Sequence, residues 1–240
     1  MYLYPFLAVI IVSIIVLFLS KKAIQINSKL TLAFSGAFLL SITVFELLPS
    51  VYFENMIDNK SDQKIIGLMI MIGILFQVIL EFFSKGAEHG HIDTKKNKLP
   101  WVLLISLSIH AFVEGFSIRL DQNILYGIFI HKIPIAFIIT TSLLSTKIKK
   151  YKILLFIFFF SIMTPLGTFI SNNSDQLLKY SLIIDSLVAG VLLHVSTTIL
   201  FETSQGHKFN LVKILLITGA IILAYFCLLY TSDAADEEDS

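Results

Sequence analysis

Two short segments place ionisable side chains among apolar residues. His110 and Glu114 lie in the segment HAFVEG, and His131 and Lys132 lie in the segment HKIPIAF, with apolar runs on both sides of each. Residues four apart share one face of a helix, so His110 and Glu114 should form a stacked pair. Imidazole together with carboxylate is a ligand set for zinc and neighbouring divalent metals. Ionisable groups at membrane depth are costly and mark functional paths, so we interpret these residues as a candidate metal site.

Other ionisable residues extend the pattern along a route from an outer carboxylate to an inner histidine cluster: Glu46, Asp185, His194 and Glu202 in apolar runs, and His89 and His91 in the segment GAEHGHIDTKK. Each member also has a simpler interpretation. A lone histidine in a membrane helix often only hydrogen-bonds a neighbouring helix. Lys132 can simply neutralise Glu114, while Asp185, Glu81 and Glu202 can reach the headgroups from the ends of their runs. The loop with two histidines can be a solvated linker.

The composition indicates a membrane protein. Hydrophobic residues make up 56% of the 240 residues, charged residues make up 15%, and the mean hydropathy is +0.84. A soluble domain carries about a quarter charged residues. The net charge of +1 gives no basic footprint for nucleic acid. A single cysteine excludes both a disulfide framework and a cysteine zinc cluster.

Eight apolar segments are long enough to cross a membrane, which takes roughly 20 mainly apolar residues. Lipid offers backbone polar groups no partner, so each segment should be a helix. We therefore expect an all-α polytopic membrane protein with eight transmembrane helices, near residues 2–20, 30–52, 65–84, 100–119, 123–145, 153–171, 180–202 and 211–230. The first segment lacks a basic n-region, so we interpret it as a span rather than a cleaved signal.

The distribution of basic residues predicts the orientation. Most of the 18 lysine and arginine residues lie in the loops after the first, third, fifth and seventh segments. Cytoplasmic loops carry the excess of lysine and arginine in membrane proteins. We therefore expect these loops to be cytoplasmic and both termini to be extracytoplasmic.

The segments carry motifs that resemble the ZIP (Zrt/Irt-like) family of divalent-metal transporters. GAFLLSITVFELLPS resembles the second span of that family, with Glu46 at its polar position. HAFVEG resembles the fourth-span motif HNxxDG or HNxPEG, HKIPIAF the fifth-span HEIPHE, and LVAGVLLHV the seventh-span AAGTFLYV. The resemblance covers essentially residues 1–226. It implies a ZIP-like bundle in which the fourth and fifth spans are central.

Carried over position by position, the resemblance implies that His110, Glu114 and His131 are ligands of the first metal site of the family. Three positions of the second site depart from the motif: Ala111 stands in place of an Asn ligand, Lys132 in place of an acid, and Ile135 in place of a bridging Glu or His. We hypothesise that the Lys132 ammonium takes the place of the second ion and holds Glu114 ionised. The centre would then hold one metal ion at most.

The function implied by the resemblance is transport of zinc, or of Fe²⁺, Mn²⁺ or Cd²⁺, into the cytoplasm without ATP. The absence of a Walker motif agrees with this and the chain is not expected to be an enzyme. Two alternatives stay open: a metal-dependent intramembrane hydrolase, although HExxH and GxSxG are absent, and a non-transporting metal-binding relative. The expected partners are a divalent ion and the lipid bilayer, with a homodimer left open and no nucleic acid. The expected location is the bacterial inner (cell) membrane.

The last residues differ in character from the rest of the chain. The ending CLLYTSDAADEEDS, residues 227–240, passes directly from an apolar run into an acidic one. Translated back into codons, it resembles a transposase-type sequencing adapter. We therefore assign the transport domain to residues 1–226 and interpret 227–240 as a non-native tail; a genuine acidic external tail is the alternative.

Overall fold

The chain is helical wherever its structure is described. The computed structural model describes residues 2–19, 28–53, 60–84, 100–119, 122–202 and 211–238, and no strand occurs among them. The prediction of an all-α protein is confirmed for this part of the chain. The loop histidines His89 and His91 lie outside the described residues.

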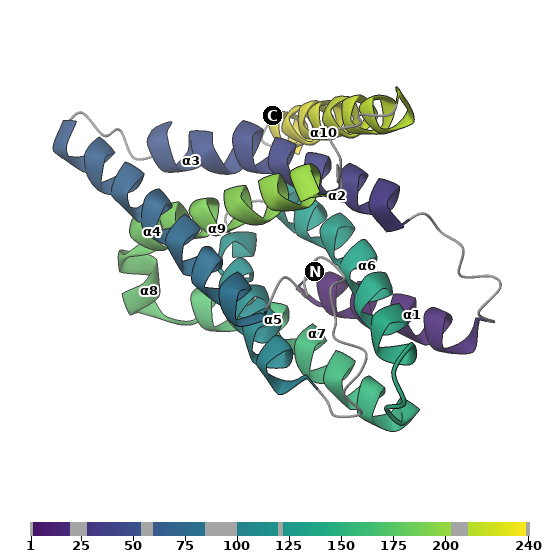
Figure 1. The fold of residues 1–240 in the computed structure, drawn as a ribbon. Helices are drawn as coiled ribbons and strands as arrows, with labels where there is room; N and C mark the ends of the chain where they lie inside the picture. The colour runs from purple at the N-terminus through teal and green to yellow at the C-terminus, as the bar shows by residue number, and fades with distance from the viewer. Residues whose placement is uncertain are drawn as a thin grey trace.

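Every apolar segment identified in the sequence contains a helix (Figure 1). The described elements are α1 (Tyr4–Phe18), α2 (Ser28–Ile42), the π-helical turn η1 (Thr43–Leu47), α3 (Leu48–Phe53), α4 (Lys60–Ser84), α5 (Trp101–Glu114), the 3₁₀ turn η3 (Ser117–Arg119), α6 (Gln122–Leu144), α7 (Lys150–Asn172), the short α8 (Asp175–Lys179), α9 (Ser181–Glu202) and α10 (Leu211–Glu238).

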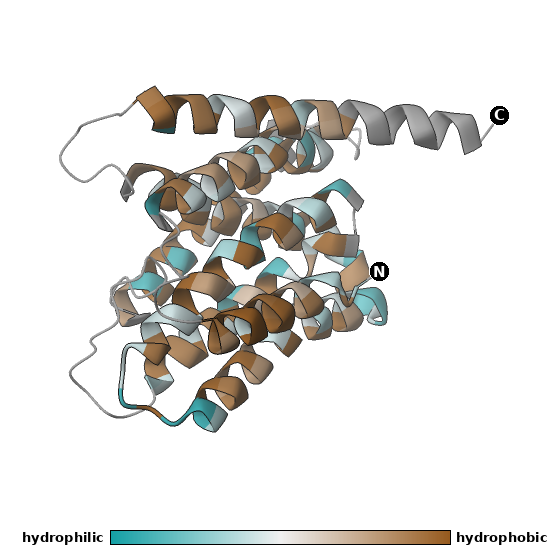
Figure 2. Ribbon diagram, turned by 90° about the vertical axis from the view of Figure 1, so that its right-hand side faces the viewer, coloured by the Kyte–Doolittle hydropathy of each residue, from teal (hydrophilic) through white to brown (hydrophobic). Residues whose placement is uncertain are grey.

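Six of the described helical stretches have the length and hydropathy to cross a membrane. They are the continuous stretch of α2, η1 and α3, and then α4, α6, α7, α9 and α10. The other two expected spans correspond to the shorter apolar helices α1 and α5. Large apolar side chains lie exposed along these helices, as lipid-facing residues would, and Figure 2 shows hydrophobic residues over much of the bundle. The chain is thus a polytopic membrane protein, while eight spans and external termini stay predictions.

The second expected span contains a local irregularity at Glu46. The π-helical turn η1 replaces ordinary α-helix there, and the Leu48 N–H bonds back to the Thr43 carbonyl oxygen. Pro49, two residues after the end of η1, has no N–H to donate to the preceding turn, which favours a break in the regular bonding pattern. Glu46 therefore sits, half-buried, on a widened turn.

Two clusters of buried apolar side chains hold the bundle together. One combines residues of α2, α3, α4, α9 and α10. The other combines residues of α1, α5 and α7. Helix α6 belongs to both, since Leu125 and Ile128 pack in the first cluster and Ile135 and Ile139 in the second. His131 and Lys132 lie on the stretch of α6 between these two pairs.

Helices α4 and α9 approach each other unusually closely at a pair of glycines. A Cβ atom added to Gly73 would meet the Leu187 carbonyl oxygen at 2.0 Å, and one added to Gly190 would meet the Ile70 carbonyl oxygen at 2.0 Å. Small residues let helix backbones come together in membranes, where the hydrophobic effect does not drive helices to associate. This contact fixes the register of α4 against α9.

Candidate metal site

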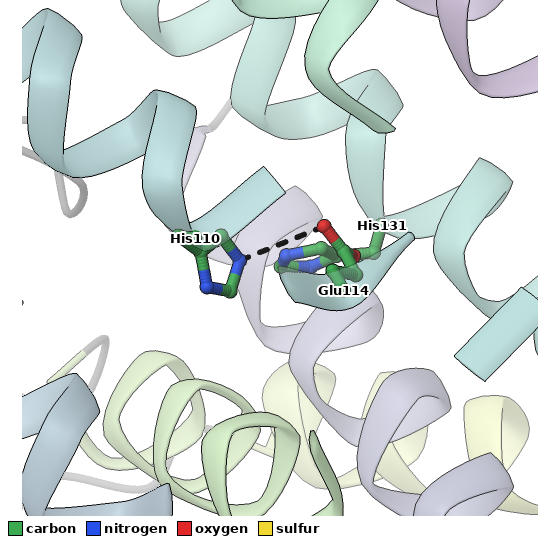
Figure 3. Close-up of side chains that lie close together, drawn as sticks. All are labelled: His110, Glu114 and His131. Atoms are coloured by element: carbon green, nitrogen blue, oxygen red, sulfur yellow. Dashed lines mark ion pairs between the residues drawn. The ribbon is translucent and has the colours of Figure 1, made fainter. Parts of the chain in front are cut away.

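Three buried side chains from two helices converge inside the bundle. His110 and Glu114 come from α5 and His131 comes from α6, and one ligand-type atom of each lies within 4.8 Å of the others. The distance from His110 Nε2 to Glu114 Oε2 is 3.7 Å. The exposed fractions are 1% for His110 and 0% for Glu114 and His131. Figure 3 shows the three side chains close together, with a dashed line joining His110 to the Glu114 carboxylate. The structure therefore brings together the three residues proposed as ligands.

The end of α5 places the Glu114 carboxylate. The expected span ran to residue 119, but α5 ends at Glu114 and a 3₁₀ turn follows. Hydroxyl groups of α7 bond the carbonyl oxygens after this end, with Thr168 Oγ1 donating to Gly115 at 2.8 Å and Ser171 Oγ donating to Phe116 at 3.4 Å. Gly115 also lies so close to α7 that an added Cβ atom would meet the Thr164 carbonyl oxygen. The helix can end in an apolar environment because the Ser117 hydroxyl donates to the Glu114 carbonyl oxygen and α7 satisfies the next two carbonyl groups.

Hydrogen bonds from two other helices orient the imidazole rings. His110 Nδ1 donates to Gln77 Oε1 of α4 at 3.2 Å, and His131 Nδ1 lies 3.4 Å from Ser35 Oγ of α2. A proton on His110 Nδ1 leaves the lone pair on Nε2, the atom that faces Glu114. Metal-binding histidines commonly have such a partner on the other ring nitrogen. Gln77 was not identified from the sequence, although a lone amide in the apolar run GILFQVILEFF was an available signal.

Lys132 contacts the same carboxylate from α6. Its Nζ lies 2.5 Å from Glu114 Oε2 and 5.1 Å from the centre of the Phe160 ring, and its exposed fraction is 1%. The expected contact between Lys132 and Glu114 is therefore present. The other oxygen, Oε1, is buried and has no hydrogen-bond partner among the described residues. One carboxylate oxygen is thus neutralised while the other is available to a metal ion.

The neighbouring positions of the site are apolar. Ala111 and Ile135, which the resemblance aligned with ligands of a second metal, are buried in the apolar cluster shared by α1, α5, α6 and α7. Neither side chain offers a ligand atom. The three positions that depart from the motif thus provide a cation and two hydrocarbon side chains, whereas a second ion would need oxygen or nitrogen ligands there.

The remaining candidate residues are not among the three whose ligand-type atoms converge. Glu46 is on η1, and Asp185 is buried near the start of α9 with an exposed fraction of 3%. His194 of α9 pairs with Glu81 of α4, with Nε2 and Oε2 2.7 Å apart. The simpler interpretation, in which Glu81 only reaches the lipid headgroups, does not include this contact with His194. Glu202 ends α9, and its side chain is outside the described residues.

Fold and site together define a helical membrane protein with a buried set of ligands suited to a divalent metal. A family model described as ZIP Zinc transporter matches residues 88–227, more than half of the chain. The chain belongs to the ZIP zinc transporter family, which confirms the resemblance seen in its motifs. This family transports ions and does not catalyse reactions, so the hydrolase alternative is not retained.

Two curated relatives are similar to parts of the chain. Protein zntD of Dictyostelium discoideum is 34% identical over 104 residues, which cover 35% of this chain and 15% of that protein. Zinc transporter ZIP1 of Danio rerio is 27% identical over 159 residues, which cover 59% of this chain and 52% of that protein. The matched regions thus span about half of one relative and much less of the other.

Proposed function

We propose that this chain carries divalent metal ions, with zinc as the principal substrate, through a one-ion site made by His110, Glu114 and His131. The observation that carries the proposal is the convergence of these three ligand-type atoms in a buried position between α5 and α6. Two ligands on one zinc ion at about 2.0–2.1 Å lie about 3.3 Å apart. The three ligand-type atoms lie within 4.8 Å of one another, so modest changes of side-chain torsion would bring them to that separation.

The chemistry of the site favours zinc among divalent ions. Two imidazoles and one carboxylate suit zinc and its transition-metal neighbours, whereas magnesium and calcium prefer sets of oxygen ligands. Lys132 balances the single negative charge, so a bound ion would meet no excess of carboxylates. We expect such a site to bind the ion with moderate affinity. This suits transport, because a transported ion must also be able to leave its site. Fe²⁺, Mn²⁺ and Cd²⁺ are secondary candidate substrates, and the relative named zinc transporter ZIP1 supports zinc.

The proposed direction is into the cytoplasm, down the gradient of the ion and without ATP. It rests on the lysine-rich loops, which favour an orientation with both termini outside. Uptake into a cell places the protein in the cell membrane. The assignment to a bacterial membrane stays a prediction, and the two relatives come from eukaryotes.

Zinc uptake into proteoliposomes tests the proposal. Replacing His110 or Glu114 with Ala should abolish zinc-dependent uptake while the protein still inserts, because each removes one of three ligands. Ser106→Ala is a matched control on the same face of α5, since its hydroxyl donates to the Leu80 carbonyl oxygen. Undiminished uptake by both ligand variants would refute the site. If the native chain binds zinc but shows no uptake, it is instead a metal-binding relative of the transporters that does not itself transport.

A further inference from the structure

A second His–carboxylate pair lies between α4 and α9, apart from the candidate metal site. His194 Nε2 is 2.7 Å from Glu81 Oε2, and Thr198 Oγ1 is 3.4 Å from the same His194 nitrogen. The three side chains offer one imidazole, one carboxylate and one hydroxyl around a single point. Figure 1 shows that α4 and α9, which carry them, lie side by side.

The two groups of polar residues are connected through α4. Gln77 and Glu81 are four residues apart and therefore share a face of this helix. Gln77 bonds His110 of the candidate metal site, and Glu81 bonds His194. One helical turn of α4 thus separates a side chain in contact with the first site from one that belongs to the second pair.

The second pair is more open to water than the first site. The side chains of His194 and Glu81 are 18% and 22% exposed, whereas those of His110 and Glu114 are 2% and 0% exposed. An ion held there would keep some of its water ligands. A site made of two protein ligands, a hydroxyl and water should bind the ion weakly. Weak binding suits an ion in transit, because conduction needs sites that release the ion they bind.

We propose that Glu81 and His194, assisted by the Thr198 hydroxyl, form a second and transient site for the transported divalent ion. The proposal rests on the transport function proposed above. Nε2 and Oε2 would have to separate from 2.7 Å to about 3.3 Å to bind one zinc ion, a change of side-chain torsions only. An ion that leaves His110 and Glu114 would pass Gln77 and then meet this pair.

Glu81→Gln distinguishes a metal site from a simple tie between helices. The amide keeps a hydrogen-bonding group of the same size beside His194, so a pair that only joins α4 to α9 should tolerate it. A zinc site loses its anionic ligand. We expect zinc uptake by the full-length chain in proteoliposomes to fall about tenfold or more in Glu81→Gln and in His194→Ala. Thr197→Val is the control, since the Thr197 hydroxyl donates to carbonyl oxygens of its own helix.

Zinc titration of the purified chain separates failure of this inference from failure of the proposed function. Glu81→Gln should retain the stronger zinc-binding event, which His110→Ala loses, but should lose the weaker event. Thr198→His adds a stronger third ligand and should tighten that weaker event, which keeps the test valid if His194→Ala does not fold. Unchanged uptake in Glu81→Gln, or no tightening in Thr198→His, overturns the second site. Undiminished binding and uptake in His110→Ala overturns the proposed function instead.

Discussion

Removing Lys132 should destabilise the fold because it leaves a buried carboxylate without its cation. Nζ and Glu114 Oε2 are 2.5 Å apart, and both side chains are almost completely buried. With an effective dielectric constant of about 20, opposite unit charges at this distance attract each other by about 7 kcal/mol. Part of that attraction offsets the desolvation of both groups. Lys132→Met should therefore cost about 3–5 kcal/mol of stability, as is usual when one partner of a buried ion pair is removed.

A double-mutant cycle isolates the Lys132–Glu114 interaction. Lys132→Met combined with Glu114→Gln removes both charges and should be much less destabilised than Lys132→Met alone, within about 1 kcal/mol of the native chain. Unfolding of the purified chains in mixed micelles, followed by circular dichroism, measures the three variants. Equal destabilisation of the single and the double variant would show that the two charges do not interact, and would refute the reasoning.

Zinc provides an independent check on the same carboxylate. A divalent ion at Glu114 supplies the positive charge that Lys132→Met lacks. Saturating zinc should therefore stabilise Lys132→Met more than it stabilises the native chain, and should stabilise the double variant least, because that variant has lost the Glu114 ligand. Equal stabilisation of all three chains would show that zinc does not bind at Glu114.

Three further changes and one control variant test other parts of the chain. Gln77→Leu removes the acceptor for His110 Nδ1 and should weaken zinc binding about 10–100-fold, measured by titration; unchanged affinity would show that this bond does not orient the ring. Gly73→Ala places a Cβ atom 2.0 Å from a backbone oxygen of α9 and should destabilise the chain by about 1–3 kcal/mol. Gly219→Ala, with nothing within 4 Å of the new atom, should not. Deleting residues 87–93, which removes His89 and His91, should change affinity modestly and leave transport intact; complete loss in a correctly inserted chain would contradict this.

The sequence predicts contacts within a helix better than contacts between helices. His110 and Glu114 could be paired from their spacing, because helical geometry fixes which residues share a face. The motifs then associated them with His131, and the cost of a buried ammonium indicated a partner for Lys132. All three expectations agree with the geometry of the site.

Contacts that depend on the relative register of two helices could not be predicted in this way. Glu81 and His194 are 113 positions apart, and no periodicity relates one helix to another. The pairing of Gln77 with His110 was missed for the same reason. The end of α5 at Glu114 depends on hydroxyl groups of α7, which a reading of local sequence does not include.

The glycine contact between α4 and α9 has a consequence for how this chain can change length. Gly73, Gln77 and Glu81 follow one another at intervals of four on α4, as do Gly190, His194 and Thr198 on α9. One residue inserted after Gly73 would turn the rest of α4 by about 100°, carrying Gln77 and Glu81 away from their partners while the glycine contact held α4 in place. Insertions and deletions should therefore be tolerated in the loops between helices but should inactivate the chain within these two intervals. In a library of single-residue insertions, we expect no functional variant with an insertion in residues 73–81 or 190–198.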